Sequence, residues 1–329
     1  MNGMRFAAGL VVALLCVGPT RAADLELVQT IVLKGKAGGL DHLALDSKHE
    51  RLFLANKTNN TLDVVDLKAG KLLKQIPNQQ GVQGVAYAPE LDKLFVGLGV
   101  KGFCNVFDGE SFKLVESIKF EDDADNVLYN AAAKLVYVAH AVKSVGVIDA
   151  KTFDLKTDIK LPGSVEGLAI EKGRPRLYAN IPSPSMVAVI DTEKNEVIAK
   201  YPVQLAGSAH PIALDEVNHR MFVGCRKEPM VIVMDTETGK EITGIPIPGD
   251  IDDLVYDAKR KRLVATCGDG FLVVIKQTDA DHYEVAEKIA TAKGAKTSFF
   301  SADKDQIYLA VPRQEGKEGP EVRVYQVKP

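Results

Sequence analysis

The stretch "GSAHPIALDEVNHRMFVGC" (residues 207–225) contains a short apolar run, a polar turn and a second apolar run with an aromatic residue. The pattern recurs at six other places, among them "LDHLALDSKHERLFLAN" (40–56) and "VEGLAIEKGRPRLYANI" (165–181). Measured at the residue that follows each first run, successive copies are 42, 42, 41, 44, 42 and 44 residues apart. These anchor residues are Asp46, Ala88, Asn130, Glu171, Asp215, Asp257 and Ser301. A period of roughly 20 to 50 residues is typical of a repeat architecture.

Each unit continues with a third apolar run that ends in or beside Asp, such as "VAVID" (187–191), and then a fourth run, such as "NEVIAKY" (195–201). Short runs rich in Val, Ile, Leu, Phe and Tyr, bounded by Gly, Asn, Asp and Lys, are typical of β-strands. Four strands in a unit of this length form one propeller blade. The sequence therefore predicts an all-β fold, a seven-bladed β-propeller with four antiparallel strands per blade.

The two ends of the chain predict how the ring closes. The last unit stops at its third strand, "EVRVYQV" (321–327), whereas "LELVQTIVLKG" (25–35) has the pattern of a fourth strand and precedes the first complete unit. A ring whose first and last blades did not join would leave exposed sheet edges. We therefore expect the N-terminal strand to complete the C-terminal blade.

Several strands resemble those of a known family. The second strands "RLFLAN" (51–56) and "KLVYVAH" (134–140), with "VAVIDTEKNEVI" (187–198) and "VIVMDTETGKEI" (231–242), are similar to the YVTN family of seven-bladed β-propellers, which is related to surface-layer repeat proteins. The second strands seldom end in Thr-Asn, and the Pro-Asp-Gly turn of the family is mostly absent. The resemblance covers essentially all of the mature chain and implies the fold. It implies little about function, because the family includes many secreted or periplasmic proteins without assigned chemistry.

The N-terminus predicts the compartment. A basic segment, "MNGMR", precedes the apolar run "FAAGLVVALLCVG" (6–18), and "PTRAAD" offers a cleavage position after Ala22. This order is typical of a secretory signal peptide, and the apolar run is too short to span a bilayer. We expect a signal peptide over 1–22, a single propeller domain over 23–329, and a periplasmic or extracellular protein with no transmembrane segment after cleavage.

Composition excludes some functions. A net charge of −3 provides no basic field for nucleic acid, so no nucleic-acid partner is expected. The chain lacks the Cys-x-x-Cys-His motif of covalent haem attachment, the Gly-x-Ser-x-Gly motif of a serine nucleophile, and a phosphate-binding glycine loop. It has no Trp, which excludes the Trp-Asp repeats of WD-type propellers and the tryptophan docking repeats of quinone-cofactor propellers. The expected partners are a small polar ligand or another protein.

The candidate binding residues lie five positions before each anchor, where every blade carries a polar residue at the predicted start of its innermost strand. We call these seven the ring residues: Asp41, Gln83, Asp125, Glu166, His210, Asp252 and Lys296. They should surround one mouth of the central channel, and a concave opening with convergent polar groups is the default ligand site. The alternative interpretation is that the polar ring only satisfies strand ends and holds water. The next residue, His42, and Arg226 at the end of a second strand complete the predicted ligand-binding set.

Two metal sites are alternatives at this mouth. Regucalcin-like and gluconolactonase-like propellers hold a divalent cation with carboxylate and amide ligands, which would make the protein a metal-dependent hydrolase or lactonase, although those families generally have six blades. The residues available for this are Asp41, Asp125, Asn126, Glu166 and Asp252. A copper or zinc site would instead use His140, His210, Cys225 and Cys267. The sequence requires no cofactor. A third hypothesis is that the protein is an accessory subunit of a periplasmic redox or transport assembly.

The remaining Cys and His residues have simpler interpretations. Cys104 begins a third strand and is expected in the core. Cys225 and Cys267 occupy equivalent places in adjacent blades, about 9 Å apart rather than the roughly 5.5 Å that a disulfide prefers, so a bridge would need loop distortion. His219 lies in a turn about 20 Å from His210 and cannot share a metal with it. His49 is expected in the equivalent turn of the first blade.

Overall fold

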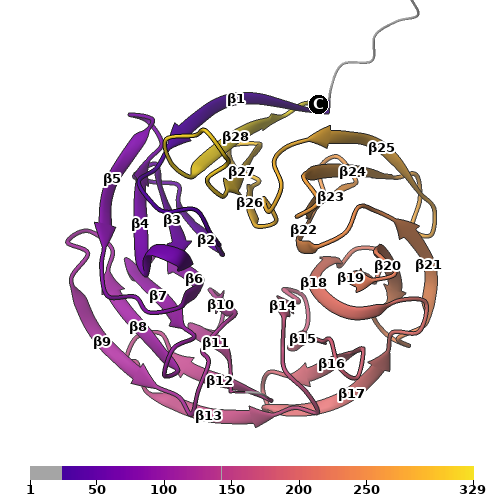
Figure 1. Cartoon of the computed structure of the whole chain (residues 1–329). Helices are drawn as coiled ribbons and strands as arrows, with labels where there is room; N and C mark the ends of the chain where they lie inside the picture. The colour runs from indigo at the N-terminus through magenta and orange to yellow at the C-terminus, as the bar shows by residue number, and fades with distance from the viewer. Residues whose placement is uncertain (1–23, 142) are drawn as a thin grey trace, which may run out of the picture.

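The computed structural model describes residues 24–141 and 143–329, so the predicted signal peptide lies outside the described residues. These residues form seven four-stranded antiparallel sheets arranged as blades around a central channel (Figure 1). The predicted seven-bladed propeller is therefore confirmed. In the part of the chain that is described, no helix has the length and apolar character needed to cross a membrane.

The first four blades follow one another along the chain. Blade 1 comprises β2 (Leu43–Asp46), β3 (Arg51–Asn56), β4 (Thr61–Asp66) and β5 (Lys71–Ile76), with the short 3-10 helix η1 (Lys57–Asn59) between β3 and β4. Blade 2 comprises β6 (Val82–Ala88), β7 (Lys93–Leu98), β8 (Phe103–Asp108) and β9 (Leu114–Lys119). Blade 3 comprises β10 (Val127–Asn130), β11 (Leu135–His140), β12 (Ser144–Asp149) and β13 (Leu155–Lys160). Blade 4 comprises β14 (Gly167–Ile170), β15 (Arg176–Ile181), β16 (Met186–Asp191) and β17 (Glu196–Pro202).

The last three blades complete the ring. Blade 5 comprises β18 (Gly207–Asp215), β19 (Arg220–Lys227), β20 (Met230–Asp235) and β21 (Glu241–Pro246). Blade 6 comprises β22 (Ile251–Asp257), β23 (Arg262–Cys267), β24 (Phe271–Gln277) and β25 (Tyr283–Ala290). Blade 7 comprises β26 (Ser298–Ser301), β27 (Gln306–Val311), β28 (Glu321–Val327) and β1 (Leu25–Val32).

The ring closes as the sequence predicts. Strand β1 pairs antiparallel with β28, from Leu25 opposite Val327 to Val32 opposite Glu321. Arg262 of β23, only 2% exposed, donates to the Asp24 carboxylate at 2.9 Å and to the Lys328 backbone carbonyl, which ties both ends of the propeller chain to blade 6. Removing one partner of such a buried ion pair is strongly destabilising.

The core lies between adjacent blades and is built from the second and third strands. An aromatic residue occupies the same position of the second strand in six blades and is at most 1% exposed in each: Phe53, Phe95, Tyr137, Tyr178, Phe222 and Tyr308. Outer strands such as β9 leave several apolar side chains exposed, because one of their faces meets solvent. This packing holds the innermost strands at a fixed radius around the channel.

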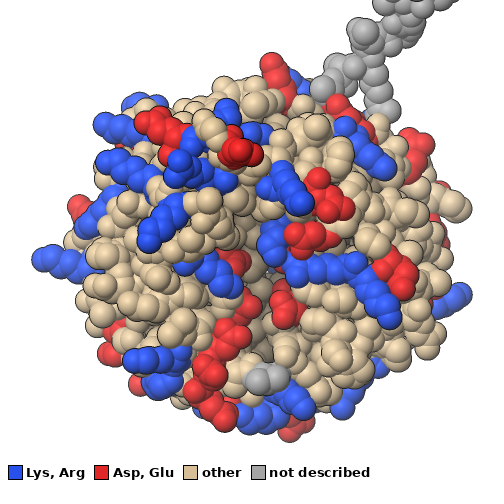
Figure 2. Space-filling model, in the orientation of Figure 1, with Lys and Arg blue, Asp and Glu red and all other residues tan. Residues whose placement is uncertain are grey.

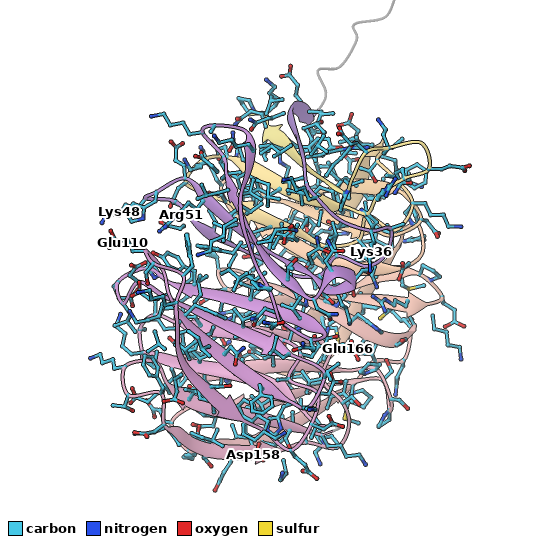
Figure 3. All side chains as sticks on the ribbon, turned by 60° about the vertical axis from the view of Figure 1, so that its left-hand side comes forward. Lys36, Lys48, Arg51, Glu110, Asp158 and Glu166 are labelled. Carbon is cyan, nitrogen blue, oxygen red and sulfur yellow. The ribbon has the colours of Figure 1, made fainter. Side chains whose placement is uncertain are left out.

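The two faces of the ring differ in their loops. Figure 3 shows Lys36 and Glu166 at one face and Lys48, Arg51 and Glu110 at the other. The first face carries the segments that enter each innermost strand and the loops that leave each second strand, and we call it the ring face. The opposite face carries the turns between first and second strands.

Ring closure generates the first prediction. Ile31 of β1 is 1% exposed in the core shared with blade 1, so Ile31→Ala should lower the free energy of unfolding by about 2 to 5 kcal/mol. The adjacent Val32 is 47% exposed, and Val32→Ala should change it by less than about 0.5 kcal/mol. Urea denaturation of both variants measures the difference. Equal effects would show that β1 does not seal the ring.

Candidate functional site

A β-bulge positions the ring residues in blades 1 to 6, and in blade 7 Ala310 N donates to the Thr297 carbonyl beside Lys296. In blade 1, Asp41 N donates to the Ala55 carbonyl (2.8 Å) and Ala55 N donates to the His42 carbonyl (3.0 Å), so two residues oppose one. In blade 2 the register shifts between Val82 and Val85, which leaves Gln83 as an extra residue. One residue of each second strand lies opposite this segment. In the order of the blades, these residues are Ala55, Gly97, Ala139, Asn180, Gly224, Thr266 and Ala310. A bulge bends its strand and changes the direction of a side chain.

This geometry corrects one expectation. The ring residues were predicted to start the innermost strands, yet in blades 1, 3, 4 and 7 the regular strand begins after them, as β10 does at Val127. In blades 2, 5 and 6 the ring residue lies within the strand but at the register shift. The extra residue does not follow the alternation of side chains between the two faces of the strand, and its side chain is therefore free to point toward the channel mouth.

Close contacts between adjacent blades hold the bulges in place. A Cβ on Gly84 would lie 2.0 Å from the Asp125 carbonyl oxygen, so only glycine permits this approach of blade 3. Asn180 of β15 donates to the carbonyl oxygens of His210 (3.0 Å) and Pro211 (2.9 Å) in blade 5. The backbone of the mouth is thus fixed by contacts across blades.

One side of the mouth is a network of ion pairs. Arg226 hydrogen-bonds the Asp252 carboxylate and the Ile251 carbonyl, the latter at 2.9 Å, and Lys296 Nζ lies 3.1 Å from Asp252 Oδ2. Asp250 lies 3.6 Å from Arg226 and also approaches Lys296. Figure 2 shows acidic and basic side chains side by side around the central hollow of this face.

On another side of the mouth, Lys57, which follows β3, links ring residues of two blades. Its ammonium group hydrogen-bonds the Gln83 side-chain oxygen and lies 3.4 Å from Asp41 Oδ2. Gln83 Nε2 in turn donates to Asp123 Oδ1 at 2.9 Å. The structure therefore brings ring residues of different blades into common networks.

Asp123 and Asp250 were missed by the sequence reasoning. Both lie two residues before a ring residue and have positive φ, 37° and 59°, as does Ser208 before His210. Gly and Asp adopt this left-handed conformation more readily than most residues. The sequence contained a signal for this position, because only Gly, Asp or Ser lies two residues before a ring residue. In the order of the blades, these residues are Gly39, Gly81, Asp123, Ser164, Ser208, Asp250 and Gly294.

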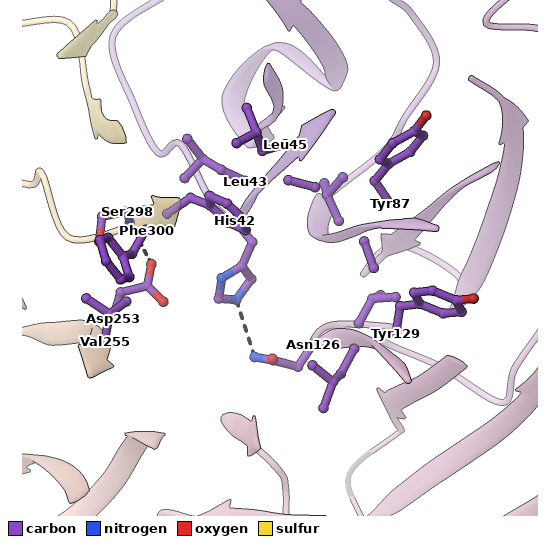
Figure 4. Close-up of a pocket in the computed structure, with 16 residues that line it drawn as sticks. His42, Leu43, Leu45, Tyr87, Asn126, Tyr129, Asp253, Val255, Ser298 and Phe300 are labelled. Carbon is purple, nitrogen blue, oxygen red and sulfur yellow. Dashed lines mark hydrogen bonds between the residues drawn. The ribbon is translucent and has the colours of Figure 1, made fainter. Parts of the chain in front are cut away.

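A second layer lies below the ring residues. Asn126 Nδ2 is 3.2 Å from the Glu166 carbonyl oxygen and 3.3 Å from His42 Nε2, and the His42 imidazole projects into the channel (Figure 4). Asp253 Oδ2 accepts a 2.6 Å hydrogen bond from Ser298 N. These side chains come from three different blades, so the layer exists only in the closed ring.

The charges of this layer perturb one another. Burial alone would lower the pKa of His42, but four nearby carboxylates raise it to about 9. These carboxylates belong to Asp41, Asp253, Asp125 and Asp252. Burial raises the pKa values of Asp125 and Asp253 to about 7, although the His42 charge opposes both shifts. The nearest carboxylate oxygen to His42 Nε2 is Asp41 Oδ1, at 3.7 Å. Titratable groups with strongly shifted pKa values are typical of functional sites.

His210 faces Glu166 across the mouth. His210 Nδ1 lies 2.9 Å from the Ser208 carbonyl oxygen, and His210 Nε2 lies 3.9 Å from Glu166 Oε2. Burial lowers the pKa of His210, and Arg226 lowers it further. Burial raises the pKa of Glu166, whereas the charge of Arg226 lowers it.

The channel widens beneath His42 into a cavity of about 380 Å³. His42, Asn126 and Asp253 form its polar end, and the innermost strands of blades 1, 2, 3, 6 and 7 supply mainly apolar walls (Figure 4). The wall residues include Leu43, Leu45, Val85, Val127, Val255 and Phe300. An apolar cavity with a few convergent polar groups has the character of a ligand pocket.

The predicted His and Cys metal set is not assembled. His140 Nε2 lies 2.8 Å from Asp158 Oδ1 in β13, and its ring packs 4.4 Å from the ring of Phe120, so it turns away from the mouth. Cys225 and Cys267 are free, fully buried, and belong to the cores of different blade interfaces. Among the residues that the structure describes, no three His, Cys, Asp or Glu side chains are grouped as a metal would require. The carboxylate metal set is therefore not assembled either.

The remaining residues lie where the sequence placed them. Cys104 is a buried core residue, and no disulfide joins the three described cysteines. His49 is exposed in the β2–β3 turn beside Asp46, and His219 is exposed in the β18–β19 turn with φ 54°. Neither histidine contributes to the mouth.

Comparison with known proteins shows the fold alone. No family model and no curated protein matches the chain. A chain of Kuenenia stuttgartiensis hydrazine synthase is similar over 84% of this chain and 94% of its own length, with 16% identity and a TM-score of 0.75. A chain from the crystal structure of the mitotic checkpoint complex is similar over 99% of both, with 14% identity and a TM-score of 0.77. At such low identity neither likeness indicates a function.

The second prediction concerns His42. Replacing its nearest carboxylate in Asp41→Asn should lower the His42 pKa from about 9 by about one unit, because a neighbouring negative charge is lost. NMR titration of the imidazole signals measures this shift. His282 is an internal control, since its pKa is raised by its own hydrogen bond to Asp279. A His42 pKa that does not respond would contradict the proposed coupling across the mouth.

Proposed function

We propose that this protein binds a ligand or a protein partner at the mouth on its ring face. The observation that carries the proposal is the repeated bulge, which directs one polar side chain of each of blades 1 to 6 toward a single opening. Core packing alone would not require polar residues at all seven positions, because equivalent apolar residues could satisfy the same backbone hydrogen bonds. Their convergence therefore supports selection for recognition.

The charge balance of the mouth supports the same proposal. Seven carboxylates meet four basic groups there, so the mouth is not a neutral set of matched ion pairs. The acidic residues are Asp41, Asp123, Asp125, Glu166, Asp250, Asp252 and Asp253, and the basic ones are His42, Lys57, Arg226 and Lys296. Several of these side chains remain partly exposed, including Lys296 at 32% and Glu166 at 36%. An arriving molecule can therefore reach groups that are already oriented.

We also propose that binding takes place outside the cytoplasm, in the periplasm or the extracellular space. The basic segment, apolar run and cleavage position at the N-terminus support this location. Membership of the YVTN family is proposed on the strand motifs together with the seven-bladed architecture. A role as an accessory subunit would use the same mouth as a docking surface.

The third prediction tests the mouth directly. The mature protein, affinity-tagged and recovered gently from its own host, should carry a ligand or partner that native mass spectrometry detects. Lys296→Ala and Arg226→Ala should each change this occupancy about tenfold, because each removes a positive charge from the mouth: occupancy by a partner that contacts these cations falls, whereas occupancy by a cationic ligand rises. Occupancy that is the same in wild type and in both variants would contradict the proposal.

Lys48→Ala is the matched control. Lys48 is exposed on the opposite face (Figure 3), and its replacement makes the same change of charge and side-chain length as Lys296→Ala. Occupancy should be unchanged in this variant. A change equal to that of Lys296→Ala would place the binding surface elsewhere or show a non-specific charge effect.

A further inference from the structure

The gap between His210 and Glu166 lacks a hydrogen-bond donor. His210 is 7% exposed, and its Nδ1 lies 2.9 Å from the Ser208 carbonyl oxygen, which can only accept. Nδ1 therefore carries the hydrogen, and in the neutral imidazole Nε2 is an acceptor. This tautomer is assigned from the hydrogen bond. Burial favours the neutral ring, since it lowers the pKa of His210.

Glu166 presents a second acceptor to the same gap. Its Oε2 lies 3.9 Å from His210 Nε2, beyond hydrogen-bond distance, and two acceptors cannot bond each other. Within 24–141 and 143–329, no side chain or backbone group donates a hydrogen bond to the Glu166 carboxylate. His210 Nε2 and Glu166 Oε2 are thus two hydrogen-bond acceptors that face the same space, and a donor from a bound molecule would satisfy both.

The surroundings favour a donor with a positive charge. The acidic side chains of the mouth outnumber its basic groups by seven to four, with Arg226 and Lys296, whose charges lower the pKa of His210, counted together with His42 and Lys57. Asn126 connects the two layers, because its amide nitrogen contacts both the Glu166 carbonyl and His42. Neither Glu166 nor His210 lines the apolar cavity, whose polar end is formed by His42, Asn126 and Asp253, so the hydrocarbon or aromatic body of a ligand would reach it past Asn126 (Figure 4).

We propose that the mouth binds a small organic amine, whose primary ammonium group donates to Glu166 Oε2 and His210 Nε2 and whose apolar body enters the channel cavity. This inference rests on the proposed function and names the ligand class. A carboxylate or phosphate ligand would be repelled by the surplus of negative charge. A quaternary ammonium would supply charge but no hydrogen for either acceptor. The pair therefore selects a protonated amine for its hydrogens as well as for its charge.

Isothermal titration calorimetry with 2-phenylethylamine tests the proposal. The wild-type protein should bind this amine at least ten times more tightly than 2-phenylethanol or its N,N,N-trimethyl derivative, because the alcohol has no positive charge and only one hydrogen to donate, and the trimethyl derivative has the charge but no N–H. Phenylacetate should not bind. Equal affinity for the amine and the alcohol, or preference for phenylacetate, would overturn the proposal.

A pair of isosteric variants locates the site. Glu166→Gln removes the charge and provides an amide that can itself donate to His210, so affinity for 2-phenylethylamine should fall at least tenfold. Glu318→Gln makes the same change in the exposed loop after β27 on the same face, and affinity should not change. Far-ultraviolet circular dichroism confirms that both variants fold. Unchanged affinity in Glu166→Gln would overturn the assignment.

The two proposals fail in different ways. If the Lys296→Ala variant loses its native ligand or partner while 2-phenylethylamine does not bind, the mouth is a binding site and the amine class is wrong. If neither the native occupancy nor amine binding responds to any mouth variant, the proposed function fails as well. Amine binding that responds to Glu166→Gln supports both.

Discussion

The two-against-one bulge in the innermost strands of blades 1 to 6 is the constraint on which the mouth depends. It preserves the backbone hydrogen bonds between first and second strands, as Asp41 N and His42 O show on either side of Ala55. At the same time it removes one residue from the inward and outward alternation of the strand. The freed residue can then be polar without placing a polar group in the core between blades. Because closure fixes all seven blades, the freed residues converge on one opening.

Convergence changes the chemistry of the side chains. A histidine beside a single carboxylate, such as His282 beside Asp279, already has a raised pKa, and His42 is held as a cation well into alkaline solution by carboxylates from blades 1, 3 and 6. Burial lowers the pKa of both histidines, but at His210 the positive charges of Arg226 and Lys296 add to this effect, so its neutral form is favoured. The same residue type thus provides a fixed positive charge in one layer and a hydrogen-bond acceptor in the other. Under the proposed function, this division would let the mouth discriminate ligands by both charge and hydrogen bonding.

The sequence predicted the blades, their closure and the ring residues, because a period of about 42 residues aligns equivalent positions directly. It could not predict contacts such as that of Asn126 with His42, since these depend on how blades meet across the channel. The His and Cys metal hypothesis failed for a related reason. A strand-end position determines the face on which a residue lies, but not the direction of its side chain, and His140 turns outward to Asp158. The bulge itself is visible in sequence only as Gly, Asp or Ser two residues before each ring residue.

The central claim is that the mouth is one electrostatic unit that accepts a positive charge. The most direct measurement is the number of protons released when 2-phenylethylamine binds near pH 7, obtained by calorimetry in buffers with different ionisation enthalpies. An incoming cation favours the ionised carboxylates, and the pKa values of Asp125 and Asp253 are about 7 before it arrives. Binding should therefore release protons. Binding without proton release, proton uptake, or no binding at all would contradict the account.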